Sequence, residues 1–161
     1  MKERNKVRFM VQSAAIAAIY VVLTLLTNVF GLANGVIQVR FSEAMTVLPC
    51  VMPAAIPGLT IGCLISNTLT GAMALDIVFG SFATLIGAVF TYMLRKYRFL
   101  APLPPIISNT VIIPFVLAFV YKFEGSVWYF MITVGIGEII SCGVLGGLLL
   151  MTLKRLPRKF L

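Results

Sequence analysis

The sequence predicts an all-α membrane protein with six helices, and three observations lead to this prediction. Of the 161 residues, 60% are hydrophobic and only 11% are charged, and the mean hydropathy is +1.05. Apolar stretches of about 20 residues, the length that crosses a bilayer, recur along the chain. Gly, Pro and charged residues separate these stretches. A soluble domain has about 25% charged residues, so this chain lacks the polar surface that water requires.

The separators predict six helices in a single integral membrane domain over residues 1–161. The expected ranges are about 8–30, 42–52, 57–71, 76–94, 104–121 and 126–153. The second and third helices are short for a crossing, and two prolines in their connection PAAIPG, residues 53–58, interrupt the helical hydrogen bonding. Such broken helices persist at membrane depth only when they are buried in protein or line a cavity.

The basic residues predict the orientation. With six crossings, one side receives three clusters: Lys2, Arg4, Lys6 and Arg8; Arg95, Lys96 and Arg98; and Lys154, Arg155, Arg158 and Lys159. The other side receives Arg40 and Lys122. Short loops rich in Lys and Arg stay in the cytoplasm, so both termini are expected there. The net charge of +8 is therefore interpreted as a topology signal and not as a nucleic-acid surface.

Residue types needed for several kinds of chemistry are absent from the sequence. It contains no histidine, no Walker A motif and no nucleophile with a partner base. Cys50, Cys63 and Cys142 lack metal-site or disulfide spacing and are interpreted as small residues of the core. We therefore expect neither an enzyme nor a bound metal or cofactor, and any use of ATP must occur in partner subunits.

Arg40 and Glu43 lie at the head of the apolar run VRFSEAMTVLPC. One interpretation is structural. Ser42 caps the second helix, the positive end of that helix favours the charge of Glu43, and a solvated Arg–Glu pair contributes little to stability. The alternative is that both side chains face a pocket that opens outward.

Four further polar residues are expected in the outer half of the bundle: Asn67, Asp76, Asn109 and Glu138. Glu138 is the most informative, because carboxylates at membrane depth almost always face a bundle interior or a wet cavity. Structural alternatives are a hydrogen-bonded glutamate for Glu138, a helix-start acid for Asp76 and interhelical hydrogen bonds for the two asparagines.

Two further features have a structural and a functional interpretation each. Trp128 either belongs to an interfacial aromatic belt or stacks on a planar ligand. In SAAIAAIY, Ala14 and Ala18 are four residues apart, a pattern that allows close helix approach. This face either packs within the chain, which physical arguments alone favour, or docks on a partner protein.

The run VRFSEAMTVLPCVMPAAIPGLTIGCLISN, then DIVFGSFATLIGA and the GE of GIGEII, resembles the QueT family over about residues 11–153. With six spans and the Ala face, the chain also looks like an S component of an energy-coupling factor (ECF) transporter of the prokaryotic plasma membrane. This resemblance implies capture of a queuosine precursor (preQ0, preQ1 or queuine) outside the cell. It further implies docking through helix one on an ECF transmembrane subunit served by two ATPases.

A 7-deazaguanine presents adjacent N–H donors beside a carbonyl, which carboxylates and amides can bind. We therefore expect substrate binding by Glu138 and Glu43, supported by Asn67, Asp76, Asn109, Arg40 and Trp128, and partner docking through Ala14 and Ala18. Three alternatives remain: an S component for another vitamin-like nutrient, a proton-coupled transporter using Glu138, and a membrane enzyme or scaffold.

Overall fold

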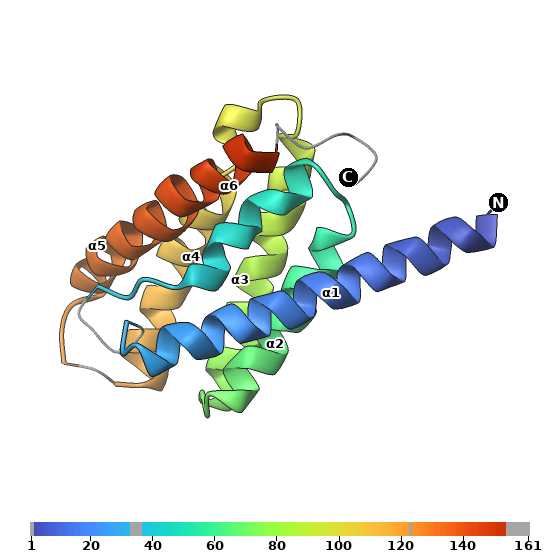
Figure 1. The fold of residues 1–161 in the computed structure, drawn as a ribbon. Helices are drawn as coiled ribbons and strands as arrows, with labels where there is room; N and C mark the ends of the chain where they lie inside the picture. The colour runs from blue at the N-terminus through green and yellow to red at the C-terminus, as the bar shows by residue number, and fades with distance from the viewer. Residues whose placement is uncertain (1, 33–36, 123, 154–161) are drawn as a thin grey trace.

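The structure is a computed structural model, and it describes residues 2–32, 37–122 and 124–153 (Figure 1). The described residues form helices and no strand, which confirms the predicted all-α class. The elements are α1 (Lys2–Val29), η1 (Phe41–Cys50), α2 (Ala55–Leu69), α3 (Ala74–Met93), η2 (Arg98–Leu100), α4 (Leu103–Phe115), η3 (Val116–Val120), α5 (Val127–Glu138), η4 (Ile139–Leu145) and α6 (Gly146–Leu153).

Four helical stretches are long and apolar enough to cross a membrane: Glu3–Val29, Ala74–Met93, Arg98–Val120 and Val127–Leu153. The two short elements between them are not. As a 3₁₀-helix of 10 residues, η1 rises about 20 Å, and α2 with 15 residues rises about 22 Å. Both fall short of the roughly 30 Å hydrocarbon core, as expected for the broken pair.

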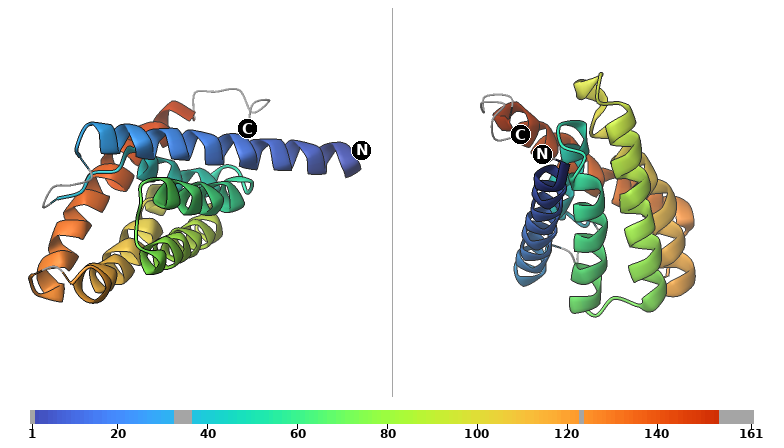
Figure 2. Two further views of the ribbon diagram at one scale, coloured as in Figure 1. Left: turned by 90° about the horizontal axis from the view of Figure 1, so that it is seen from below. Right: turned by 90° about the vertical axis from the view of Figure 1, so that its right-hand side faces the viewer.

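η1 occupies the centre of the bundle, where it packs against α1, α2, α3, η4 and α6. The α-helices from α1 to α5 surround η1, and each of them packs against the next one along the chain (Figure 2). Met45 and Leu48 of η1 form the main hydrophobic core with residues that include Tyr20, Leu59 and Cys63. This central element brings the run VRFSEA into the interior.

Two glycines allow α1 and α2 to approach closely. A Cβ at Gly58 would lie 2.7 Å from the carbonyl oxygen of Ser13, and one at Gly62 would lie 2.9 Å from Tyr20 Cβ. The Ser13 hydroxyl also donates a hydrogen bond of 2.9 Å to the carbonyl of Ala54. Small residues at helix interfaces permit such contact between membrane helices.

The connections between the helices lie at two opposite ends of the bundle. In Figure 1 the α3–α4 connection, which carries Arg95, Lys96 and Arg98, lies at the same end of the bundle as α6. The α2–α3 and α4–α5 connections lie at the opposite end. The predicted C-terminal cluster, Lys154, Arg155, Arg158 and Lys159, lies outside the described residues.

The structure corrects one predicted detail and adds another. Ser42 does not cap the second helix, because η1 begins at Phe41, and Ser42 Oγ is buried without a hydrogen-bond partner among the described residues. The expected helices 104–121 and 126–153 are not regular α-helices throughout, because each contains a π-helical segment, η3 and η4. η4 begins directly after Glu138, and π-helical segments often occur at functional sites.

Candidate functional site

Glu43, Asn109 and Glu138 meet in the interior, although they come from η1, α4 and α5. The Asn109 amide nitrogen donates to Glu138 Oε1 at 2.9 Å and lies 3.5 Å from Glu43 Oε2. The Tyr20 hydroxyl of α1 donates to Glu43 Oε1 at 2.6 Å. Glu43 is 3% exposed and Glu138 9%, so the solvated interpretation of Glu43 is wrong.

Glu43, Asn109, Glu138 and Tyr20 form a group that we call the inner cluster, and Cys142 also belongs to it. Its Sγ lies 3.1 Å from Glu138 Oε2 and 3.3 Å from the carbonyl oxygen of Glu43. Residues four apart on a helix lie on the same face, so the Glu138–Cys142 spacing already places both side chains together. Cys142 is fully buried, as expected of a small core residue, and it also contacts the two acids.

The inner cluster has ligand atoms at a spacing that could hold a metal ion, with one atom each of Glu43, Glu138 and Cys142 within 4.8 Å of one another. These side chains already contact hydrogen-bond donors on Tyr20 and Asn109. We therefore assign no metal to the cluster.

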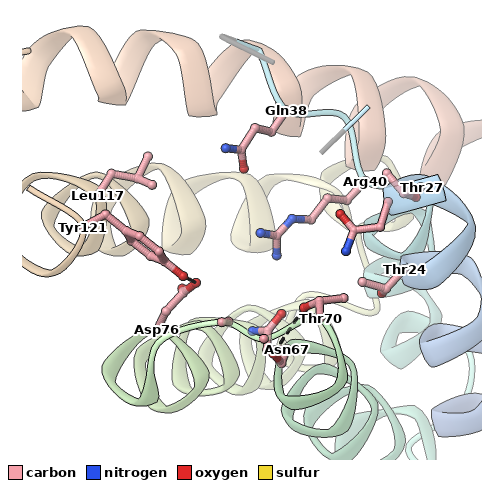
Figure 3. Close-up of a pocket in the computed structure, with 12 residues that line it drawn as sticks. Thr24, Thr27, Gln38, Arg40, Asn67, Thr70, Asp76, Leu117 and Tyr121 are labelled. Atoms are coloured by element: carbon pink, nitrogen blue, oxygen red, sulfur yellow. Dashed lines mark hydrogen bonds between the residues drawn. The ribbon is translucent and has the colours of Figure 1, made fainter. Parts of the chain in front are cut away.

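A polar cavity of about 280 Å³, which we call the outer cavity, opens beside the inner cluster. This volume is close to the lower end of small-molecule sites, roughly 300–1,000 Å³. Figure 3 shows its polar side chains converging from α1, α2, α3 and the segment before η1. It is lined by Thr24, Thr27, Asn28, Gln38, Arg40, Asn67, Thr70, Gly71, Ala72, Asp76, Leu117 and Tyr121.

Arg40 and Gln38 line both this outer cavity and a niche of about 30 Å³ next to Glu43, Asn109 and Glu138. The guanidinium of Arg40 points into the outer cavity in Figure 3. In the described part of the chain, the ion pair with a nitrogen–oxygen distance below 4.0 Å joins the exposed side chains of Lys6 and Glu3 and does not involve Arg40. Arg40 therefore does not form the weak ion pair with Glu43 that the structural interpretation included, and its guanidinium faces the cavity.

The backbone of residues 38–41 is held by two hydrogen bonds and passes close to one glycine. The Arg40 amide donates to Ser141 Oγ at 3.1 Å, and the Phe41 amide donates to Thr27 Oγ1 at 3.1 Å. At Gly137 a Cβ would overlap the carbonyl oxygen of Gln38. Gly137 thus lets this segment pass directly over α5, one residue before Glu138.

Asn67 and Asp76, both predicted site residues, line the outer cavity. The Tyr121 hydroxyl donates to Asp76 Oδ2 at 2.8 Å, while α3 begins at Ala74 with no side-chain cap at Met73. Asp76 lies in the first turn of α3, where the positive end of the helix favours an acid, and it also accepts a hydrogen bond from the residue that follows η3. Tyr121 lies just outside the membrane-spanning stretch, and its partial burial together with this contact raises the pKa of its phenol.

Trp128 lies apart from these residues. Its side chain is 76% exposed and lines neither the cavity nor the niche. This position fits the alternative of an interfacial aromatic belt.

Ala14 and Ala18 both lie on the exposed side of α1, whereas Ser13 and Ala17 are buried against α2. The favoured expectation that Ala14 and Ala18 pack within the chain is therefore wrong. The reason is that Gly58 and Gly62 accept the neighbouring face of α1 instead.

Several site residues escaped the sequence analysis: Tyr20, Gln38, Thr24, Thr27 and Tyr121. A weak signal existed for Tyr20, because a tyrosine within an apolar span needs a partner for its hydroxyl. Gln38 stands two residues before Arg40, so both point to the same side of an extended segment.

A second hollow, of about 530 Å³, lies between α3 and α4 and is lined by apolar side chains including Phe79, Phe82, Phe115 and Phe119. It contains no ionisable or amide side chain. On a helix long enough to span a membrane, such a groove is suited to lipid, and we do not assign it to a polar ligand.

The fold and the site define a membrane protein of several apolar helices with a polar cavity between them, an arrangement suited to binding a small polar molecule. The model of the family described as QueT transporter matches residues 10–155, and the chain belongs to this family.

One similar protein is the "Queuosine precursor transporter QueT" of Lactococcus lactis subsp. cremoris (strain MG1363), which is 33% identical over 84 residues. The matched region is 52% of this chain and 49% of that protein, so the chain matches about half the length of this relative. No solved structure matches the chain.

Proposed function

We propose that the protein is the substrate-capture subunit of an ECF-type importer in a prokaryotic plasma membrane, and that it binds a queuosine precursor. Membership of the QueT transporter family and the name of the Lactococcus relative support this substrate class. The observation that carries the proposal is the polar cavity, with Arg40 and Asp76 in its wall and the buried Glu43–Asn109–Glu138 cluster beside it.

The chemistry of the cavity suits a 7-deazaguanine. Such a base is flat, with N–H donors and a carbonyl on one edge, and carboxylates, an amide and a guanidinium can bind these groups directly. Glu43 and Glu138 cost free energy when buried at membrane depth. A ligand that donates hydrogen bonds to them offsets part of this cost.

The proposed partners follow from the exposed side of α1. The sequence has no Walker A motif, so hydrolysis of ATP belongs to two partner ATPases. The small residues Ala14 and Ala18 leave α1 open to close approach by an ECF transmembrane subunit. Reorientation of the substrate-loaded subunit would then deliver the substrate inward.

Direct binding tests the proposal. The purified, detergent-solubilised chain is titrated with preQ1, preQ0, queuine and guanine, with riboflavin as the control for a different vitamin class. We expect saturable binding of a deazaguanine and none of riboflavin. Glu138→Gln should weaken that binding at least about tenfold, because a hydrogen bond to a charged group contributes about 1.5–3 kcal/mol.

Glu124→Gln is the matched control, because Glu124 is an exposed carboxylate outside both the cavity and the niche. Its affinity should equal that of the unchanged protein. If folded protein binds none of the deazaguanines, the substrate assignment is wrong. Preferential binding of riboflavin would favour an S component for another nutrient.

A second candidate is a proton-coupled transporter, which the burial of Glu138 favours. Uptake into liposomes separates the two. Transport that requires the ATPase module supports the importer, whereas transport by this chain alone under a pH gradient supports proton coupling.

A further inference from the structure

The niche and the outer cavity meet at Arg40 but differ about ninefold in volume, about 30 against 280 Å³. A cavity volume of about 10–15 Å³ is enough to hold one water molecule. The niche therefore has room for a small polar group of one or two non-hydrogen atoms, whereas a fused ring fits only the outer cavity.

Charged side chains follow a fixed order along the two spaces. The Asp76 carboxylate lies in the outer cavity, Arg40 borders both spaces, and the carboxylates of Glu43 and Glu138 lie at the niche. The order from outside inward is thus acceptor, donor, acceptor pair. Tyr121 orients Asp76, and Asn109 and Tyr20 orient the inner acids.

A 7-deazaguanine has a complementary order along one side. Its 2-amino group and N1–H are donors, the 6-oxygen beside them is an acceptor, and the substituent on C7 comes next. When the donors face Asp76 and the 6-oxygen faces Arg40, the C7 substituent points toward the niche.

We propose that the inner niche binds a primary ammonium carried on a one-carbon arm at C7 of the base. This inference rests on the proposed function and assigns each part of the ligand to a part of the site. Asp76 accepts hydrogen bonds from N1–H and the 2-amino group, Arg40 donates to the 6-oxygen, and Glu43 and Glu138 bind the ammonium.

The niche also discriminates against other substituents. Arg40 borders the niche, but no cation lies within 4.0 Å of either inner carboxylate among the described residues, so a ligand ammonium in the niche would be their closest charged partner. A nitrile on C7 offers only an acceptor, and placing an acceptor against two carboxylates is unfavourable. The site therefore selects the aminomethyl form of the base over the cyano form.

The test compares 7-aminomethyl-7-deazaguanine with 7-cyano-7-deazaguanine by titration of the purified full chain. The aminomethyl compound should bind at least about tenfold more tightly, because charge-assisted hydrogen bonds to the ammonium contribute about 1.5–3 kcal/mol. In Glu138→Gln and, as a second variant, Glu43→Gln, this ratio should fall to below about threefold. Asp76→Asn should weaken both compounds alike, and Glu124→Gln should change neither.

Equal or tighter binding of the cyano compound by the unchanged protein overturns the inference, while the proposed function stands. A Glu138→Gln variant that weakens both compounds equally also overturns it, since Glu138 would then meet a group that both compounds share. Failure of the unchanged protein to bind either compound overturns the proposed function, and the inference with it. The comparison of two ligands on one protein does not depend on the folding of any variant.

Discussion

The two sides of α1 use similar small residues in opposite environments. On one side Ser13 and Ala17 are buried against α2, and Tyr20 extends from the same side to Glu43. On the other side Ala14 and Ala18 are exposed. Neighbouring residues on a helix point about 100° apart, so a shift of one position decides between core and surface.

The difference between the sides comes from what faces them. Gly58 and Gly62 on α2 bring its backbone within contact of Ser13 and Ala17. No such residue of this chain covers Ala14 and Ala18 in the described structure. A small-residue pattern therefore shows that close approach is possible, while the partner decides which face is used.

The largest expected effect is on the exposed side. Ala14→Trp should abolish uptake by the complete transporter and prevent assembly with the transmembrane subunit, because the indole blocks close approach. Binding of the deazaguanine to the isolated chain should stay unchanged, since Ala14 lines neither cavity nor niche. Uptake assays, co-purification and ligand titration measure the three quantities.

Ile19→Trp is the matched control, because Ile19 is 51% exposed and about 100° around the helix from Ala18. It should leave uptake intact. Loss of ligand binding in a folded Ala14→Trp protein would instead place this side in contact with the site.

A smaller effect is expected on the buried side. Gly62→Ala should lower the free energy of unfolding by about 1–3 kcal/mol, because its Cβ would lie 2.9 Å from Tyr20 Cβ and overpack the contact. Gly147→Ala is the control: open space surrounds its Cβ, and removing a helical glycine gains up to about 1 kcal/mol. Thermal unfolding in detergent should shift in opposite directions, and equal shifts would mean that α1 and α2 can separate freely.

The smallest effect concerns the hydroxyl that connects the buried side to the site. Tyr20→Phe keeps the ring in the core but removes the 2.6 Å hydrogen bond to Glu43. Affinity for the deazaguanine should fall roughly fivefold, which corresponds to about 1 kcal/mol. Tyr97→Phe, at a phenol that is 65% exposed, should leave affinity unchanged, and an equal affinity of both variants would remove Tyr20 from the site.

The course of the helices was largely predictable, because long apolar stretches and their Gly, Pro and charged boundaries are local features. Thus α3 covers Ala74–Met93 against an expected 76–94. The 3₁₀ conformation of η1 was not predictable, because it depends on contacts with five other elements. The π-helical turn after Glu138 was missed for the same reason, since η4 packs against η1 across about 100 residues of sequence.

Charged and amide residues in apolar helices were a sound guide to the site, and the structure brings Glu43, Asn109 and Glu138 together. The hydroxyl-bearing residues, in contrast, did not indicate the site from the sequence. Thr24 and Thr27 repeat with a spacing common in any membrane helix, and only the position of α1 beside the outer cavity gives them a role. Trp128 shows the converse, because its type suits stacking while its place at the outer start of α5 leaves it exposed.

The distances along the chain between the partners of Glu43 have a consequence for biogenesis. Glu43 emerges from the ribosome 66 residues before Asn109, which is about 3–13 s at ordinary rates of synthesis. Of the side chains that contact its carboxylate in the described part of the chain, Tyr20 alone has been made by then. The tyrosine is thus the first of these partners available to the carboxylate, before the rest of the site has been synthesised.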